Sequence, residues 1–145
     1  MAKKKESRKV AIEAVRTNRK RLLTNESPFA IKEAYVKLRT SLMFCMTADK
    51  ERPCTSFAVT SAKPSEGKSL TAANIAISYA MLGKKVLLID ADMRKPVQHK
   101  CFRLSNKVGL SDVITGDKPL DKALNRNVTG SLDVLTSGTI PPQSL

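Results

Sequence analysis

One stretch of the sequence has the residue types and order that hold phosphate; it reads Ala62, Lys63, Pro64, Ser65, Glu66, Gly67, Lys68 and Ser69. A tight loop before a helix turns backbone N–H groups toward an anion, and the helix N-terminus adds positive potential. Gly67 permits close backbone approach, and Lys68 places a charge near the β- and γ-phosphates of a nucleoside triphosphate. The Ser69 hydroxyl is a magnesium ligand in such loops. The sequence therefore predicts a P-loop, with Ala62 where glycine is commoner.

Two carboxylates, Asp90 and Asp92, follow directly after the apolar run 86–89. Open α/β sheets bind ligands outside the carboxyl ends of their strands, and these acids are expected there. A carboxylate in that position either holds magnesium through water or accepts a proton during phosphoryl transfer. The sequence thus predicts a second half of the same site at residues 90 and 92.

The elements that position these two groups follow from the hydrophobic pattern. Residues 56–60 are β-rich and run straight into the loop, while 67–82 are Ala-rich and end at Gly83, a typical helix stop. The uninterrupted apolar run 86–89 predicts a strand buried on both faces of a parallel sheet. Together these segments predict a βαβ unit in an α/β fold.

Three further elements are expected around this unit. A helix is predicted to start near Ser27-Pro28, because an apolar stripe follows at helical spacing: Ile31, Tyr35, Leu38 and Leu42. A short helix is expected over 109–114, and a third strand over 132–136. The predicted fold class is a P-loop NTPase-type parallel sheet with flanking helices, incomplete because three strands make a thin sheet.

Charge is distributed unevenly along the 145 residues. The chain carries a net charge of +13, and residues 1–23 hold nine Lys or Arg against two Glu. This basic arm, taken as residues 1–26, attracts phosphates, whether of lipid, nucleic acid or an acidic partner; a solvated tail is the simpler interpretation. Aromatic residues make up only 4%, so stacking platforms for nucleic acid are not expected. No apolar run of membrane-spanning length occurs, which indicates a cytoplasmic protein.

Beyond single motifs, the loop 61–69 and the run 87–94 resemble the Walker A and A′ motifs of bacterial tyrosine kinases. These P-loop kinases of the deviant Walker class govern capsule and exopolysaccharide synthesis. The helix residues Glu33 and Arg39, and the segments 109–113 and 136–142, also fit the family. The resemblance extends from about residue 27 to residue 145, and it implies that 27–145 form the N-terminal portion of a P-loop kinase domain.

The resemblance implies an autophosphorylating protein-tyrosine kinase that uses ATP and Mg²⁺. Lys68 and Ser69 would bind phosphate and magnesium, Asp92 would bind magnesium, and Asp90 would activate the tyrosine hydroxyl. Lys63 falls where the wider class keeps a lysine that senses nucleotide across a subunit interface. The implied partners are a transmembrane activator with a cytoplasmic tail (a polysaccharide co-polymerase), a cognate tyrosine phosphatase and further copies in a ring. That activator would recruit the chain to the inner membrane face.

The sequence departs from the family in three places. Val36 occupies the middle position of the helix motif Glu-x-x-Arg-x-x-Arg, no Walker B motif follows Arg94, and the tyrosine-rich tail is absent. The last two departures imply a chain that ends before those motifs. Two other functions stay open: a switch ATPase of the partition or division type that binds DNA or membrane, and a nucleotide-binding assembly protein without turnover.

Overall fold

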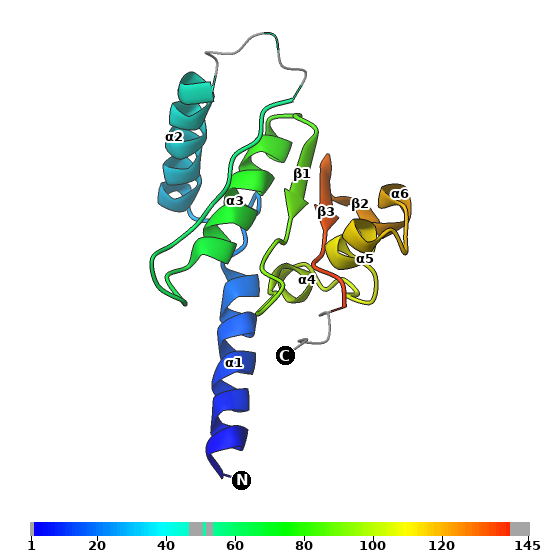
Figure 1. The fold of residues 1–145 in the computed structure, drawn as a ribbon. Coiled ribbons are helices and arrows are strands. Elements are labelled where there is room, and N and C mark those ends of the chain that lie inside the picture. Colours follow the sequence, from blue (N-terminus) through cyan, green and yellow to red (C-terminus); the bar gives the residue numbers. More distant parts are fainter. Residues whose placement is uncertain (1, 47–50, 52–53, 140–145) are drawn as a thin grey trace.

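The computed structural model describes residues 2–46, 51 and 54–139. Its sheet has three strands in the order β1-β3-β2. Strand β1 (Val86–Ile89) pairs in parallel with β3 (Leu132–Leu135), with Val86 opposite Leu132 and Ile89 opposite Leu135. Strand β2 (Leu124–Thr129) forms an antiparallel hairpin with β3. The molecule is therefore of the predicted α/β class, with a small mixed sheet (Figure 1).

Helix α3 (Lys68–Met81) covers one face of this sheet and provides half of the buried core cluster. Its small and branched side chains allow close approach to the strands; the buried cluster consists of Leu23, Ala73, Ala76, Ile77, Ala80, Leu88, Leu132 and Val134. Helix α2 (Phe29–Met46) lies on the outer side of α3, which gives the layers α2, α3 and sheet (Figure 1). The start of α2 confirms the helix predicted near Ser27-Pro28.

Three short helices lie between β1 and β2 in the sequence. Helix α4 (Gln98–Cys101) follows the acidic loop after β1. Helix α5 (Leu110–Thr115) confirms the short helix predicted over 109–114, and it ends at the left-handed Gly116. Helix α6 (Leu120–Ala123) leads directly into β2. The N-terminus of α5 is fixed to the chain that continues β3, because the Leu110 N–H donates to the Thr136 carbonyl at 2.7 Å.

The prediction of a strand over residues 56–60 is wrong in this structure. These residues have no strand pairing, and they pass along α3 rather than beside β1 (Figure 1). The Phe57 ring lies 6.5 Å from that of Tyr79 on α3, measured between centroids. A β-rich run indicates propensity, whereas a strand also requires a paired neighbour. The predicted βαβ unit is accordingly represented by its helix and second strand only.

Burial of β1 on both faces is also contradicted. Leu88 points to α3 and is buried, whereas Leu87 and Ile89 are 43% and 48% exposed. Among the described residues, α3 covers one face at these positions and no helix covers the other. Strand β2 was missed because its sequence, Leu-Asn-Arg-Asn-Val-Thr, lacks a clean alternation; as an antiparallel edge strand it needs less apolar surface.

The basic arm is helical. Helix α1 spans Ala2–Lys20 and extends away from the rest of the fold toward the N-terminus (Figure 1). At its base, the Leu23 N–H donates to Asn74 Oδ1 at 2.8 Å, and Asn74 Nδ2 donates to the Arg21 carbonyl at 3.1 Å. Asn74 is a buried residue of α3, so the segment that follows α1 is attached to the P-loop helix.

Candidate nucleotide-binding site

The P-loop forms at the N-terminus of α3 as the sequence predicts. Ser65 and Gly67 have φ angles of 64° and 86°, both in the left-handed region. Gly67 adopts this conformation without strain because it has no side chain, and its surroundings are open, since an added Cβ would meet nothing within 4 Å. The Gly67 carbonyl then accepts the first helical bond, from the Thr71 N–H at 2.9 Å. The loop is thus an open cradle leading into a helix.

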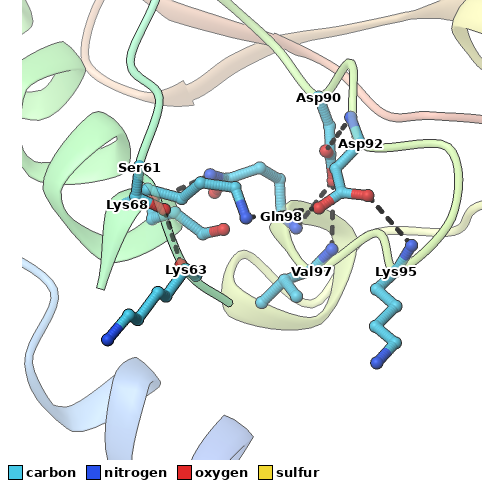
Figure 2. A network of polar contacts seen from close by, with 9 residues as sticks. Ser61, Lys63, Lys68, Asp90, Asp92, Lys95, Val97 and Gln98 are labelled. Atoms are coloured by element: carbon cyan, nitrogen blue, oxygen red, sulfur yellow. Dashed lines mark hydrogen bonds and ion pairs between the residues drawn. The ribbon is translucent and has the colours of Figure 1, made fainter. Parts of the chain in front are cut away.

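Two side chains of the loop fold back on its own backbone. The Ser61 hydroxyl donates to the Lys63 carbonyl at 2.9 Å, and the Lys63 N–H donates to Glu66 Oε2 at 3.1 Å. The Lys63 side chain points away from the two aspartates (Figure 2). Ala62, Pro64 and Ser65 are exposed turn residues. Of the two loop lysines, only Lys68 is directed into the site.

Lys68 connects the P-loop with the acidic loop. Its Nζ lies 3.4 Å from Asp92 Oδ2, and both side chains are about one-third exposed (Figure 2). The Lys95 N–H donates to Asp92 Oδ1 at 3.0 Å. This backbone hydrogen bond, followed by the hydrogen bond and the charge of Lys68, holds the pKa of Asp92 below its ordinary value. Asp92 is therefore a stable anion beside Lys68 of the P-loop.

Asp90 lies deeper and is more restrained than Asp92. It is only 6% exposed. Its Oδ2 accepts the N–H groups of Val97 and Gln98 at 3.1 and 3.0 Å, and its Oδ1 accepts that of Asp92 at 3.2 Å. Three backbone donors compensate the burial of this carboxylate. Asp90 thereby fixes the turn that carries Asp92 and the start of α4.

Gln98 is a site residue that the sequence reasoning missed. It is 4% exposed, and its Nε2 donates to the Ser69 carbonyl at 2.9 Å (Figure 2). Its backbone N–H binds Asp90, so one residue joins the P-loop helix to the acidic loop. No motif indicates this role, because Gln98 lies outside both motifs and is positioned only by the turn after β1.

The donor set fits a magnesium nucleotide. Magnesium prefers oxygen ligands, and the hydroxyl of Ser69 and the carboxylate of Asp92 are of that kind. Gln98 Oε1 is buried and has no hydrogen-bond donor among the described residues. An acceptor left open beside Ser69 suits the water molecules that magnesium retains. Lys68 and the open loop supply the positive potential that a triphosphate requires.

Comparison with known proteins agrees with this geometry. Residues 57–128 match the family described as the CobQ/CobB/MinD/ParA nucleotide binding domain. The chain is 49% identical over 110 residues to the tyrosine-protein kinase YwqD of Bacillus subtilis, covering 76% of this chain and 45% of that protein. It is 40% identical over 112 residues to the putative tyrosine-protein kinase CapB of Staphylococcus aureus, covering 77% of this chain and 48% of CapB.

Solved structures give the same result. The chimerical protein CapA2B2 superimposes with a TM-score of 0.75 at 39% identity, over 85% of this chain and 53% of that one. The kinase domain of the Escherichia coli tyrosine kinase ETK gives 0.70 at 38% identity, over 77% and 43%. Fold and site thus define a P-loop nucleotide-binding domain of the MinD/ParA class. Within that class, the chain is a homologue of the bacterial tyrosine kinases, and it spans about half the length of YwqD and of CapB.

Proposed function

We propose that this chain provides the ATP-binding part of a bacterial protein-tyrosine kinase that acts in capsule or exopolysaccharide synthesis. The observation that carries the proposal is the convergence of Lys68 and Asp92, from two separate motifs, at 3.4 Å. A phosphate-binding lysine beside an ionised carboxylate at a P-loop is the arrangement that phosphoryl transfer from MgATP requires. The names of the relatives, all tyrosine-protein kinases, select tyrosine as the acceptor.

Each site residue has a defined task in this proposal. Bound MgATP supplies the phosphoryl group. The loop 62–69 holds the phosphates, Lys68 balances their charge, and Ser69 and Asp92 provide oxygen ligands for Mg²⁺. Asp90 takes the proton of the tyrosine hydroxyl and, through its three N–H bonds, keeps Asp92 in place. Lys63 reaches outward, as a residue that contacts nucleotide in a neighbouring copy would.

We further propose that the kinase assembles with other copies and is recruited to the membrane by a transmembrane activator. Helix α2 supports assembly, because it has no buried residue and exposes Ile31, Val36 and Leu38. A cognate phosphatase would reverse the phosphorylation. Within the described part of the chain, no helix is long and apolar enough to cross a bilayer.

Labelled ATP distinguishes the kinase from a switch ATPase. The protein is incubated with [γ-³²P]ATP, Mg²⁺ and the cytoplasmic tail of its activator, and the label is followed into phosphotyrosine. We expect phosphotyrosine from the wild type and a loss of at least about 100-fold in Lys68→Met, since a charge-assisted contact to phosphate is lost. Lys107→Met, which removes an exposed lysine outside the loop, serves as the matched control and should keep phosphotyrosine formation within about 2-fold of the wild type.

Two other results would point elsewhere. Release of free phosphate without phosphotyrosine would refute the kinase and favour a switch ATPase, which has the same loop. Tight binding of a fluorescent ATP analogue with neither product would favour a nucleotide-binding assembly protein.

The variant Asp90→Asn, which tests the proposed proton acceptor, requires a stability measurement alongside, because an amide nitrogen cannot accept the N–H groups of Val97 and Gln98.

A further inference from the structure

Helix α1 carries most of its positive charge on one side, with Lys3 on the opposite side. At 100° per residue, Lys4 to Lys20 span an arc of about 160° on the helix, and six basic residues with described side chains lie in it. We call this the basic face; its members are Lys4, Lys5, Arg8, Lys9, Arg16 and Lys20, with Ile12 in their midst. The two acids of the helix, Glu6 and Glu13, lie outside the arc beside one edge. A basic composition alone does not require the basic residues of α1 to gather on one side of the helix and the acidic residues to lie outside it.

The basic face is open to a partner. All six basic side chains are exposed, and none of them forms an ion pair with another described residue. Ile12 is 50% exposed in the middle of these charges. The ion pairs found among the described residues lie elsewhere, on α2, at the P-loop and on the hairpin. Six uncompensated cations around an apolar side chain form a surface suited to an anionic plane.

The base of α1 is fixed while its length extends outward. Leu23 lies in the core cluster, and the two hydrogen bonds of Asn74 tie residues 21–23 to α3. Figure 1 shows α1 extending from this base with the N-terminus at its far end. A surface that binds the basic face would therefore hold the nucleotide-binding site at a fixed distance from itself.

We propose that the basic face of α1 binds directly to an anionic lipid surface, independently of the nucleotide and of any protein activator. Clusters of four to eight Lys or Arg on a helix bind the phosphates of acidic lipids, and each residue adds to the attraction. Ile12 lies where it enters the boundary between headgroups and acyl chains. The helix thus acts as an electrostatic contact that orients the domain on the membrane.

A lipid plane fits the face better than a nucleic acid does. A helix in the major groove is surrounded by phosphates on both sides, and Glu6 and Glu13 would then face one of the two strands. On a flat surface both acids lie to one side of the contact. The arc also lacks the Asn, Gln or aromatic side chains that read or stack on bases, and it presents Ile12 in their place.

Vesicle sedimentation tests this contact with the whole chain and no nucleotide. Vesicles of phosphatidylglycerol and phosphatidylcholine are compared with vesicles of phosphatidylcholine alone. We expect binding to the anionic vesicles only, falling by about 10-fold or more between 50 and 500 mM NaCl because the charges are screened. The triple variant Lys5→Gln/Lys9→Gln/Arg16→Gln should weaken binding by about 10- to 100-fold. Glutamine preserves helix propensity, and circular dichroism verifies the helix.

The matched control removes three exposed lysines elsewhere: Lys84→Gln/Lys107→Gln/Lys118→Gln has the same net charge as the first variant. We expect it to bind within about 2-fold of the wild type. Equal losses in the two variants would show a nonspecific effect of net charge and overturn the proposal. So would equal binding to neutral vesicles. Tight binding of a DNA duplex through the basic face, without binding to vesicles, would make α1 a nucleic-acid surface and overturn it as well.

Discussion

Gln98 connects the two halves of the site, yet its side chain is only half satisfied. Nε2 donates to the Ser69 carbonyl, whereas the buried Oε1 has no donor among the described residues. An unpaired buried acceptor costs about 1–3 kcal/mol, and a neutral hydrogen bond contributes about 0.5–1.5 kcal/mol. A residue with that balance does little for folding. Its value lies in holding the P-loop helix against the acidic loop.

Gln98→Met separates these two roles, because methionine has a similar volume and no amide. We expect the free energy of unfolding in urea to change by less than about 1 kcal/mol, since a lost bond is offset by the removal of an unpaired atom. Binding of a fluorescent ATP analogue with Mg²⁺ should weaken by about 5-fold or more. Unchanged nucleotide affinity would show that Gln98 only fills space.

Asp92 makes stability depend on pH in the acidic range. The Lys95 N–H, and then Lys68, lower its pKa from the ordinary value of 3.8. The charged form is favoured in the folded state, so its contribution is complete above that value and disappears as the pH falls through the folded pKa. Urea unfolding between pH 7 and 2 should show a flatter decline below about pH 4 in Asp92→Asn.

A second variant tests the cause of the lowered pKa. In Lys68→Met the Lys95 N–H still donates to Asp92. Because that hydrogen bond is the largest single cause, part of the decline should persist in Lys68→Met. If Lys68→Met flattened the curve as much as Asp92→Asn, the ion pair rather than the backbone would control Asp92.

At the scale of elements, α5 packs tightly against the chain that continues β3. A Cβ on Gly109 would overlap the backbone N of Gly138 and the backbone O of Thr136. Gly109 is extended, with φ of −168°, so the restriction is the close approach of two backbones rather than the dihedral angle. Backbone atoms cannot rotate away as a flexible side chain can.

Gly109→Ala should therefore be strongly destabilising, by about 3 kcal/mol or more, as overpacking against backbone is. Gly116→Ala is the matched control at the other end of α5. There φ is 80° and an added Cβ meets nothing within 4 Å, so only the left-handed conformation is penalised, by about 1–2 kcal/mol. Thermal unfolding measures the loss of stability in each variant and should show the larger loss in Gly109→Ala. An equal loss of stability in the two variants would show that the α5 segment moves away from the chain that continues β3 and so accommodates the added Cβ.

Arg39 attaches α2 to the P-loop helix of its own chain. Its Nη1 donates to the Ser78 carbonyl at 2.7 Å and to the Ser78 hydroxyl at 3.2 Å. Hydrogen bonds from a charged group contribute about 1.5–3 kcal/mol. Arg39→Met should lose part of that amount, because it also removes the buried Nε, which has no acceptor among the described residues. Hydrogen exchange should then accelerate over residues 29–46.

Lys37→Met is the matched control for Arg39. Lys37 forms an exposed pair with Glu33 on the same helix, at 3.0 Å, and its loss should change stability by less than about 1 kcal/mol. Unchanged exchange in Arg39→Met would show that apolar contacts alone hold α2 on α3.

For the molecule as a whole, the sequence predicts the residues of the candidate site more accurately than it predicts the strands of the sheet. The P-loop and the acids after β1 were predicted because each depends on local residue order. The prediction for 56–60 failed because pairing depends on which edge a segment meets, and this run meets Tyr79 of α3 instead. Gln98 was not foreseen because its role arises from a turn that brings residues 69 and 98 together. Motifs that depend on local residue spacing can be predicted from the sequence, whereas contacts between residues far apart in the chain cannot.

The net charge of +13 has a consequence for the whole molecule as well. Like charges repel more in the compact state than in the unfolded chain, and salt screens that repulsion. The screening length falls from about 30 Å at 0.01 M to about 8 Å at 0.15 M ionic strength. We therefore expect the free energy of unfolding to rise with NaCl over this range, and less steeply in Lys5→Gln/Lys9→Gln/Arg16→Gln.

Urea unfolding in NaCl and in Na₂SO₄ at equal ionic strength separates screening from anion binding. Screening alone predicts similar curves, whereas an anion held at the P-loop stabilises the folded state further in sulfate. Lys68→Met should remove the part of that additional stabilisation that comes from anion binding at the P-loop, and the part due to exclusion of sulfate from the protein surface should remain. A fall in stability with NaCl would contradict the argument, because it would mean that attraction between charges, such as that of Lys68 for Asp92, outweighs the repulsion among the excess cations.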